Sequence, residues 1–161
     1  MNAMLNSMEK RLVSRFIKKR GTQVLNIIKS ADEKIVVHYT TRTEESEYLH
    51  MYADIIKNRR LIRPPLPLGI HCILKNKDEI WLGRLDVYHH QINKGYGTIL
   101  VKELIQFAQE HGYKTISGYM SAGESAEHRS RLRHFYSKLG FELQDASNFS
   151  MHLHTPVVAP E

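Results

Sequence analysis

The sequence predicts one domain of the α/β (α+β) class, in which a mixed central β-sheet carries helices on both faces. Two observations support this class. Segments with apolar residues at helical spacing are interleaved with short β-branched runs, and glycine or proline separates many of these segments. Their order is helix, strand, helix, hairpin, helix, strand, helix, strand, strand, which is typical of a mixed sheet with packed helices. A chain of 161 residues is long enough to bury a core without disulfides or metals.

The N-terminal third begins with an amphipathic helix. Its apolar residues recur at three- and four-residue steps, at Leu5, Met8, Leu12 and Phe16. Gly21 is the predicted stop, and residues 22–30 are expected to continue in a helical or nearly helical conformation. We expect residues 1–154 to form a single domain, of which residues 1–30 are a basic, helical N-terminal segment.

A strand and a second helix are predicted next. Residues 35–39 are rich in β-branched side chains and predict a short strand. The segment 41–44, Thr-Arg-Thr-Glu, has the pattern of a capping box. Apolar residues follow it at helical spacing, so a helix ending near Asn58 is expected. The proline-rich segment 63–67 predicts a loop within the domain.

The remaining elements follow from changes in period. Two strand-like runs, 70–75 and 79–88, flank a turn at 76–78 and predict a hairpin. The expected elements after it are a helix at 96–111, a strand at 114–120, a helix at 124–139 and two short strands at 141–143 and 149–153. Gly112 and Gly140 are the predicted stops of the two helices. A flexible tail is expected at 155–161.

The composition indicates the cellular compartment in which the protein is expected. No apolar run approaches the roughly 20 residues that a membrane-spanning helix needs. The N-terminus lacks an uninterrupted apolar segment with a small-residue cleavage site. The single cysteine, Cys72, excludes an internal disulfide and fits a reducing compartment. We therefore expect a cytoplasmic protein that does not associate with membranes.

The net charge of +6 is concentrated in the first 30 residues, which hold seven Lys or Arg residues and one acid, Glu9. The rest of the chain carries equal numbers of basic and acidic residues. A solvated face of the first helix is the favoured explanation, and a patch for nucleic acid is the alternative. The solvated face is favoured because no basic groove with interleaved aromatic residues accompanies the charge.

The segment 85–97 is the most informative part of the chain. A strand runs into a polar loop that holds Lys94, Gly95 and Gly97 and opens directly into a helix. The first amides of a helix lack internal partners and carry partial positive charge, so they bind phosphate readily. A glycine lets the backbone approach a ligand closely. The loop matches neither a Walker phosphate loop nor a dinucleotide fingerprint.

Two motifs in this half resemble the GCN5-related N-acetyltransferase (GNAT) superfamily. Residues 87–97, followed by Thr-Ile-Leu-Val, resemble its motif A, which reads Val-x-x-x-x-Arg/Gln-x-x-Gly-x-Gly/Ala. Residues 135–141, Phe-Tyr-Ser-Lys-Leu-Gly-Phe, resemble the motif that closes the last helix in many members. The resemblance covers about residues 80–143. One position departs from it, because Ile92 stands at the Arg/Gln position and Gln91 lies one residue earlier.

The resemblance implies the GNAT acyl-CoA N-acyltransferase fold and an acetyl-CoA-dependent N-acetyltransferase. The cosubstrate would be acetyl-CoA, the partner a primary amine of a small molecule or peptide, and no metal would be needed. Tyr136 would return a proton to the departing thiolate. The residues that the resemblance assigns to acetyl-CoA are Leu85, Asp86, Val87, Gln91, Ile92, Asn93, Lys94, Gly95, Tyr96, Gly97, Thr98 and Tyr136.

The base that deprotonates the amine is left open. His89, His90 and Glu124 are candidates near the expected site, and a histidine has a suitable intrinsic pKa. Asp86 alternates with its strand neighbours and is expected to point to the opposite face of the sheet. The ten histidines do not show the spacing of a metal site, so no metal is predicted.

The sequence is also compatible with two other functions. A non-catalytic acyl-CoA-binding module is one alternative, because Ile92 stands at the motif's Arg/Gln position. An acetyltransferase directed at RNA or aminoacyl-tRNA is another alternative, because the basic helix could bind nucleic acid. The acceptor is not indicated, and neither is the oligomeric state, for which a homodimer is one option.

Overall fold

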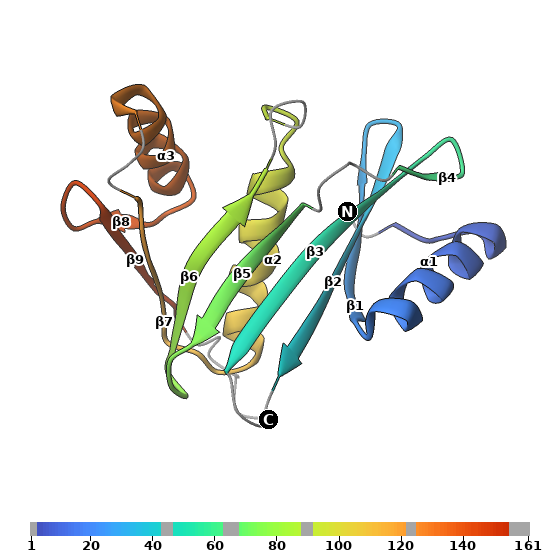
Figure 1. Cartoon of the computed structure of the whole chain (residues 1–161), viewed down its shortest axis with the longest axis horizontal. Helices are drawn as coiled ribbons and strands as arrows, with labels where there is room; N and C mark the ends of the chain where they lie inside the picture. The colour runs from blue at the N-terminus through green and yellow to red at the C-terminus, as the bar shows by residue number, and fades with distance from the viewer. Residues whose placement is uncertain (1–2, 43–46, 63–67, 88–91, 122–124, 155–161) are drawn as a thin grey trace, which may run out of the picture.

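The computed structural model describes residues 3–42, 47–62, 68–87, 92–121 and 125–154. Two antiparallel halves of a sheet meet at one pair of parallel strands, and a helix crosses behind the sheet (Figure 1). The elements are α1 (Ser7–Arg20), β1 (Gln23–Ser30), β2 (Glu33–Arg42), β3 (Tyr48–Lys57), β4 (Arg60–Ile62), β5 (Leu68–Leu74), β6 (Glu79–Asp86), α2 (Tyr96–Glu110), β7 (Thr115–Tyr119), α3 (Ala126–Lys138), β8 (Glu142–Leu143) and β9 (Asn148–His152).

The described strands form one nine-stranded sheet in the order β1-β2-β3-β5-β6-β7-β9-β8, with β4 beside β3. Its pairs are antiparallel except for β6 and β7, which run parallel. A parallel pair needs a crossover connection, and α2 supplies it. The mixed sheet predicted from the sequence is therefore confirmed, and α2 connects the two parallel strands along the chain.

Helices cover both faces of the sheet, as predicted. Alternate residues of β2 separate into two clusters, because successive side chains of a strand point to opposite faces. Ile35 and Val37 pack in the main core with α2, whereas Val36 packs with Val13 of α1. We call the side that carries α2 the helix face and the opposite side, on which α1 lies, the far face.

The first helix has well-formed ends. The Asn6 side chain accepts the amide of Glu9 and the Glu9 carboxylate accepts the amide of Asn6, which is a capping box, a feature that stabilises a helix by about 1 kcal/mol. Gly21 has φ 64° and closes the helix in the left-handed conformation. The predicted helix and its stop are confirmed. None of the described helices has the length and apolar composition to cross a membrane.

Two predictions for the N-terminal third are wrong. Residues 22–30 do not continue the helix, because Gln23–Ser30 form β1, and the predicted second helix is strand β3. The strand β3 is covered on both sides, with Met51 and Ile55 in the main core and Ile56 against α1. Burial on both faces removes the alternation that marks a strand in a sequence.

The later elements agree with the sequence. The hairpin β5–β6, the helices α2 and α3, and the strands β7, β8 and β9 lie where the pattern predicted them, within a few residues at each end. Gly112 and Gly140 have positive φ at the ends of the two helices. The predicted loop at 63–67 and the tail at 155–161 lie outside the described residues.

We predict that Gly118→Ala destabilises the fold by about 2 kcal/mol, because overpacking a well-filled core typically has that effect. A Cβ built at Gly118 would lie 2.3 Å from Cζ of Phe149 and 3.0 Å from the carbonyl oxygen of Leu82. Urea denaturation would measure the loss. Gly97→Ala is the matched control, since its Cβ would meet neighbours at 3.5 Å, an ordinary contact distance. Equal stability of the two variants would contradict the prediction.

Candidate functional site

The two parallel strands share only a short ladder. The register runs from Glu79 opposite Thr115 to Leu82 opposite Gly118 and ends there. Beyond this point β6 continues to Asp86 on its other neighbour, β5, and β7 continues on β9. Beyond this point the facing edges of β6 and β7 have no strand partner in the described part of the chain, and the two strands diverge in Figure 1. We call the place where the ladder ends the fork.

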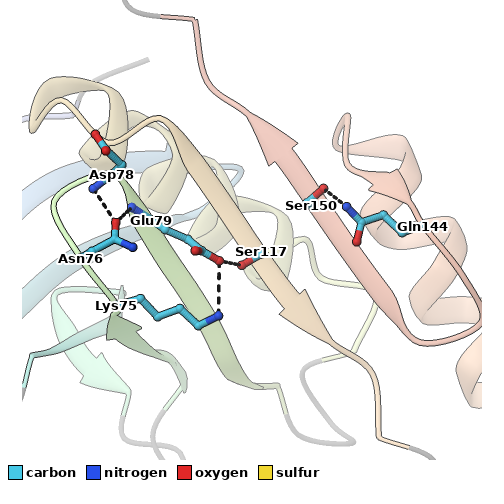
Figure 2. Close-up of polar contacts among 7 residues, drawn as sticks. All are labelled: Lys75, Asn76, Asp78, Glu79, Ser117, Gln144 and Ser150. Atoms are coloured by element: carbon cyan, nitrogen blue, oxygen red, sulfur yellow. Dashed lines mark hydrogen bonds and ion pairs between the residues drawn. The ribbon is translucent and has the colours of Figure 1, made fainter.

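Polar contacts hold the opposite end of the ladder closed (Figure 2). The carbonyl of Asp78 accepts the amides of Lys114 and Thr115 at 2.8 and 3.0 Å. Ser117 of β7 donates to the carboxylate of Glu79 at the start of β6. These bonds join the strands at one end, so the separation develops only toward the fork.

The helix α2 begins beside the divergent part of β6 with unused amides. Its N-cap, Gly95, has φ 83°, no side chain caps it, and the first turn contains no acid. The first helical bond runs from the amide of Ile99 to the carbonyl of Gly95. Within the described residues no acceptor is bonded to the amides of residues 96–98. These amides and the helix dipole make an electropositive end suited to an anion.

The helix-face side of β6 points toward this helix end. A Cβ built at Gly97 would lie 3.5 Å from Cγ2 of Val87, 3.5 Å from Cζ of Phe135 and 3.7 Å from Cδ2 of Leu85. These three apolar side chains converge on the backbone where α2 starts. The structure thus brings together Leu85, Val87 and Gly97, three of the residues that the resemblance assigns to acetyl-CoA.

The other predicted binding residues are placed in different ways. Ile92 is 37% exposed, and Asn93 and Lys94 are also exposed beside the helix start. The Tyr96 side chain is buried, and its hydroxyl donates to Glu33 at 2.6 Å. The side chain of Tyr96 therefore anchors α2 to β2 and leaves only its backbone amide for a ligand. Thr98 is half-buried in the first turn.

Tyr136 lies close to the fork. It is 4% exposed, and its ring stacks on Phe149 with centroids 4.0 Å apart. Phe149 is the register partner of Gly118, the last residue of the shared ladder on β7. Burial raises the pKa of the Tyr136 phenol above its usual value, so the group stays protonated at neutral pH. The structure gives its hydroxyl no hydrogen-bond partner among the described residues.

Asp86 points to the far face, as its position in the strand predicted. Its carboxylate Oδ2 lies 3.2 Å from Nε2 of His71 and 3.0 Å from Nε of Arg84. Gln91, His89, His90 and Glu124 lie outside the described residues, so these predicted roles stay predictions. No group of metal-ligating side chains occurs in the part of the chain that the structure describes.

Sequence reasoning missed His71, which contacts this carboxylate, and His50, which contacts His71. His50 Nδ1 lies 2.6 Å from His71 Nδ1, across the pairing of β3 with β5. This contact was not predictable, because the segment around His50 was expected to form a helix. Recognising residues 48–57 as a strand would have been the signal needed to find it.

Comparison with known proteins identifies the family. The model described as the Acetyltransferase (GNAT) family matches residues 30–141, which is more than half of the chain. The protein therefore belongs to the GNAT acetyltransferase family. None of the curated proteins compared with the chain matches it.

Two solved structures are similar to the chain at low sequence identity. A GNAT family acetyltransferase from Elizabethkingia anophelis with acetyl-CoA bound is 13% identical, with a TM-score of 0.54 over 74% of this chain and 97% of that chain. The ribosomal-protein-S18-alanine N-acetyltransferase from Escherichia coli is 19% identical, with a TM-score of 0.47 over 69% and 70%. The first likeness shows that the chain has the GNAT fold.

Proposed function

We propose that the protein transfers the acetyl group of acetyl-CoA to a primary amine of a small molecule or peptide. One observation carries the proposal: a helix N-terminus, whose first amides have no acceptor among the described residues, lies beside the strand that leaves the ladder at the fork. Family membership supports acetyl transfer, and the related structure with acetyl-CoA bound supports the cosubstrate. The amine would attack the thioester directly, without an acyl-enzyme.

The pyrophosphate of acetyl-CoA would be held by the amides at the start of α2. Gly95 suits this role because its left-handed backbone turns the loop and adds no side chain. Lys94 would add a positive charge at the rim. Ile92 offers no polar side chain at the motif's Arg/Gln position, so the backbone amides would carry most of the binding. The residues present therefore fit a diphosphate.

The pantetheine arm would pair with the edge of β6 that β7 leaves unpaired, like an added strand. Leu85 and Val87 would line it on the helix face. The thioester carbonyl would lie at the fork, where a backbone amide near Val87 would stabilise the oxyanion. The new C–N bond forms as the C–S bond breaks, and the CoA thiolate takes a proton from Tyr136.

A second candidate is a module that binds acyl-CoA without transferring the acyl group, which Ile92 favours. Purified native protein separates the two functions. Native mass spectrometry and calorimetry would measure acetyl-CoA binding, and a thiol-reactive chromophore would measure CoA release. The acceptors tested would be aliphatic diamines, aromatic amines and peptides with free α-amino groups. Binding with CoA release supports the transferase, and binding without release over the whole panel supports the module.

We predict that Gly95→Glu weakens CoA binding by more than about tenfold, which corresponds to about 1.4 kcal/mol. The carboxylate would place a charge of the same sign where the diphosphate is held. Gly95 has φ 83°, so the control is Gly95→Asn, which tolerates this backbone conformation and adds no charge. Calorimetric titration with CoA measures both variants. Unchanged affinity in a folded Gly95→Glu protein would refute the site.

We predict that Tyr136→Phe lowers kcat by about 100-fold or more, the usual contribution of a positioned acid. The affinity for acetyl-CoA should change little, because phenylalanine keeps the ring that stacks on Phe149. Steady-state kinetics and calorimetry measure the two quantities separately. A native kcat in the variant would show that Tyr136 is not the acid and that its role is structural.

A further inference from the structure

The solvent-facing side of α1 carries positive charge alone. Every exposed ionisable residue from Ser7 to Lys19 is a cation, and these cations are Lys10, Arg11, Arg15, Lys18 and Lys19. Glu9, the one acid of the helix, is buried, and its carboxylate lies 2.7 Å from Nζ of Lys34. No carboxylate of the described residues pairs with the exposed cations. We call this side of α1 the basic face.

The spacing of these cations suits a polyanion. Arg11, Arg15 and Lys18 stand at i, i+4 and i+7, so they project from one side of the helix. This stripe rises about 10 Å along the helix axis. Phosphates of one stacked strand are about 3.4 Å apart, so the stripe spans about three nucleotides. Like charges at i, i+4 destabilise a helix, and a bound polyanion would remove that repulsion.

The fold places aromatic rings beside the basic face, which the sequence pattern did not indicate. Because β3 is a strand, Tyr48, His50 and Tyr52 all point to the far face, opposite to the core residues between them. Their rings stack in chain order, with centroids 6.0 and 6.4 Å apart. Tyr48, at the end of this ring stack, is 41% exposed, and so its ring is accessible to a ligand.

Arg20 joins the ring stack to α1. Its guanidinium carbon lies 4.1 Å from the centroid of Phe16 on α1 and 5.7 Å from that of Tyr52 on β3. A hollow of about 240 Å³ at this junction is lined by Arg20, Thr22, Thr40 and Tyr52. Cations and hydroxyls contact phosphates, and aromatic rings stack on bases. The basic face and the ring stack therefore form one continuous surface.

The chemistry of this surface distinguishes between polyanions. A membrane takes up a helix through its apolar side, and in α1 that side packs on the sheet through Val13 and Ile17. An acidic peptide would pair with the cations but has no bases to stack on a ring. A duplex keeps its bases stacked inside the helix, away from protein rings. A single strand offers phosphates and accessible bases together.

We propose that the basic face and the ring stack bind single-stranded nucleic acid. The phosphates lie along Arg11, Arg15 and Lys18, and a base stacks on the exposed ring of Tyr48. Charge and stacking act on every nucleotide, so binding depends strongly on salt and weakly on base sequence. This binding does not rest on the acetyl transfer proposed above.

The first test measures the contribution of the basic face. The probe is a fluorescein-labelled single-stranded RNA of mixed sequence, and anisotropy gives its association constant between about 50 and 200 mM salt. Replacing Arg11, Arg15 and Lys18 together with glutamine should reduce the slope of log K against log salt by about 2, because each phosphate contact on a single strand contributes about 0.7. Glutamine is a good helix former, so α1 should persist.

The control for this triple variant removes three exposed cations from the other two helices. Its substitutions are Lys102→Gln on α2 and Arg131→Gln and Lys138→Gln on α3, which leave the same net charge on the protein. The control should keep the native salt slope and affinity. Equal slopes in the two triple variants would overturn the role of the basic face.

The second test separates stacking from charge. Tyr48→Ala should weaken RNA binding by about tenfold, the usual effect of losing one stacked base, without changing the salt slope. Tyr48→Phe keeps the ring and should bind as the native protein does. Tyr119→Ala, which removes a 47% exposed tyrosine on β7, is the matched control. Native affinity in Tyr48→Ala would overturn the stacking.

Other ligands test the assignment to a single strand. The native protein should bind the single-stranded RNA more tightly than duplex RNA of the same sequence, polyglutamate, or vesicles that contain phosphatidylserine. Equal or tighter binding of any of these three would overturn the proposal. The two proposals fail separately. A protein that binds acetyl-CoA but not the RNA refutes the nucleic-acid surface alone. A protein that binds the RNA but neither binds acetyl-CoA nor releases CoA refutes the acetyltransferase alone.

Discussion

The short ladder between β6 and β7 is the constraint on which the rest of the site depends. Each strand is committed to its outer neighbour, since Asp86 pairs with Gly69 of β5 and Gly118 pairs with Phe149 of β9. The Phe149 ring occupies the space beside Gly118 that a Cβ would need. Because the two strands follow different neighbours, they separate after four paired residues. The separation leaves one backbone edge of β6 for an extended ligand.

The two faces of β6 then have different chemistry at the same residues. Leu85 and Val87 on the helix face are apolar and approach the start of α2, where amides without acceptors favour an anion. Asp86, between them in the chain, joins charged and titratable groups on the far face. Strand alternation therefore separates an apolar, anion-favouring surface on one face of β6 from ionisable side chains on the other.

Burial distinguishes two histidines on the far face. His38 is fully buried between Thr22 and Asp54, with its ring nitrogens 2.9 and 2.7 Å from their oxygens. The helix α1 covers this ring through Phe16. A wholly enclosed, bonded histidine contributes to structure, because a substrate has no access to it. His71 is only partly buried, so its ring is accessible to solvent.

The amino-acid pattern alone determined much of the second half of this protein. Its elements are marked by local signals, namely the glycines after α2 and α3, the turn of the β5–β6 hairpin and the two family motifs. Each of these signals depends on only a few consecutive residues. Asp86 was assigned to the opposite face from the period of a strand, and its contacts with His71 and Arg84 confirm that assignment.

Tertiary structure decided the rest. Residues 48–57 form an inner strand that is covered on both faces, and burial on both sides removes the periodic signal of a strand. Residues 23–30 form an edge strand, which exists because it pairs with β2. The pairing of His50 with His71 depends on the register of β3 and β5, which no local pattern specifies. The end of the β6–β7 ladder likewise depends on pairing with distant strands. Helix ends, turns and short motifs depend on residues close together in the sequence. Strand register and the covering of the sheet faces depend on contacts between residues far apart in the sequence.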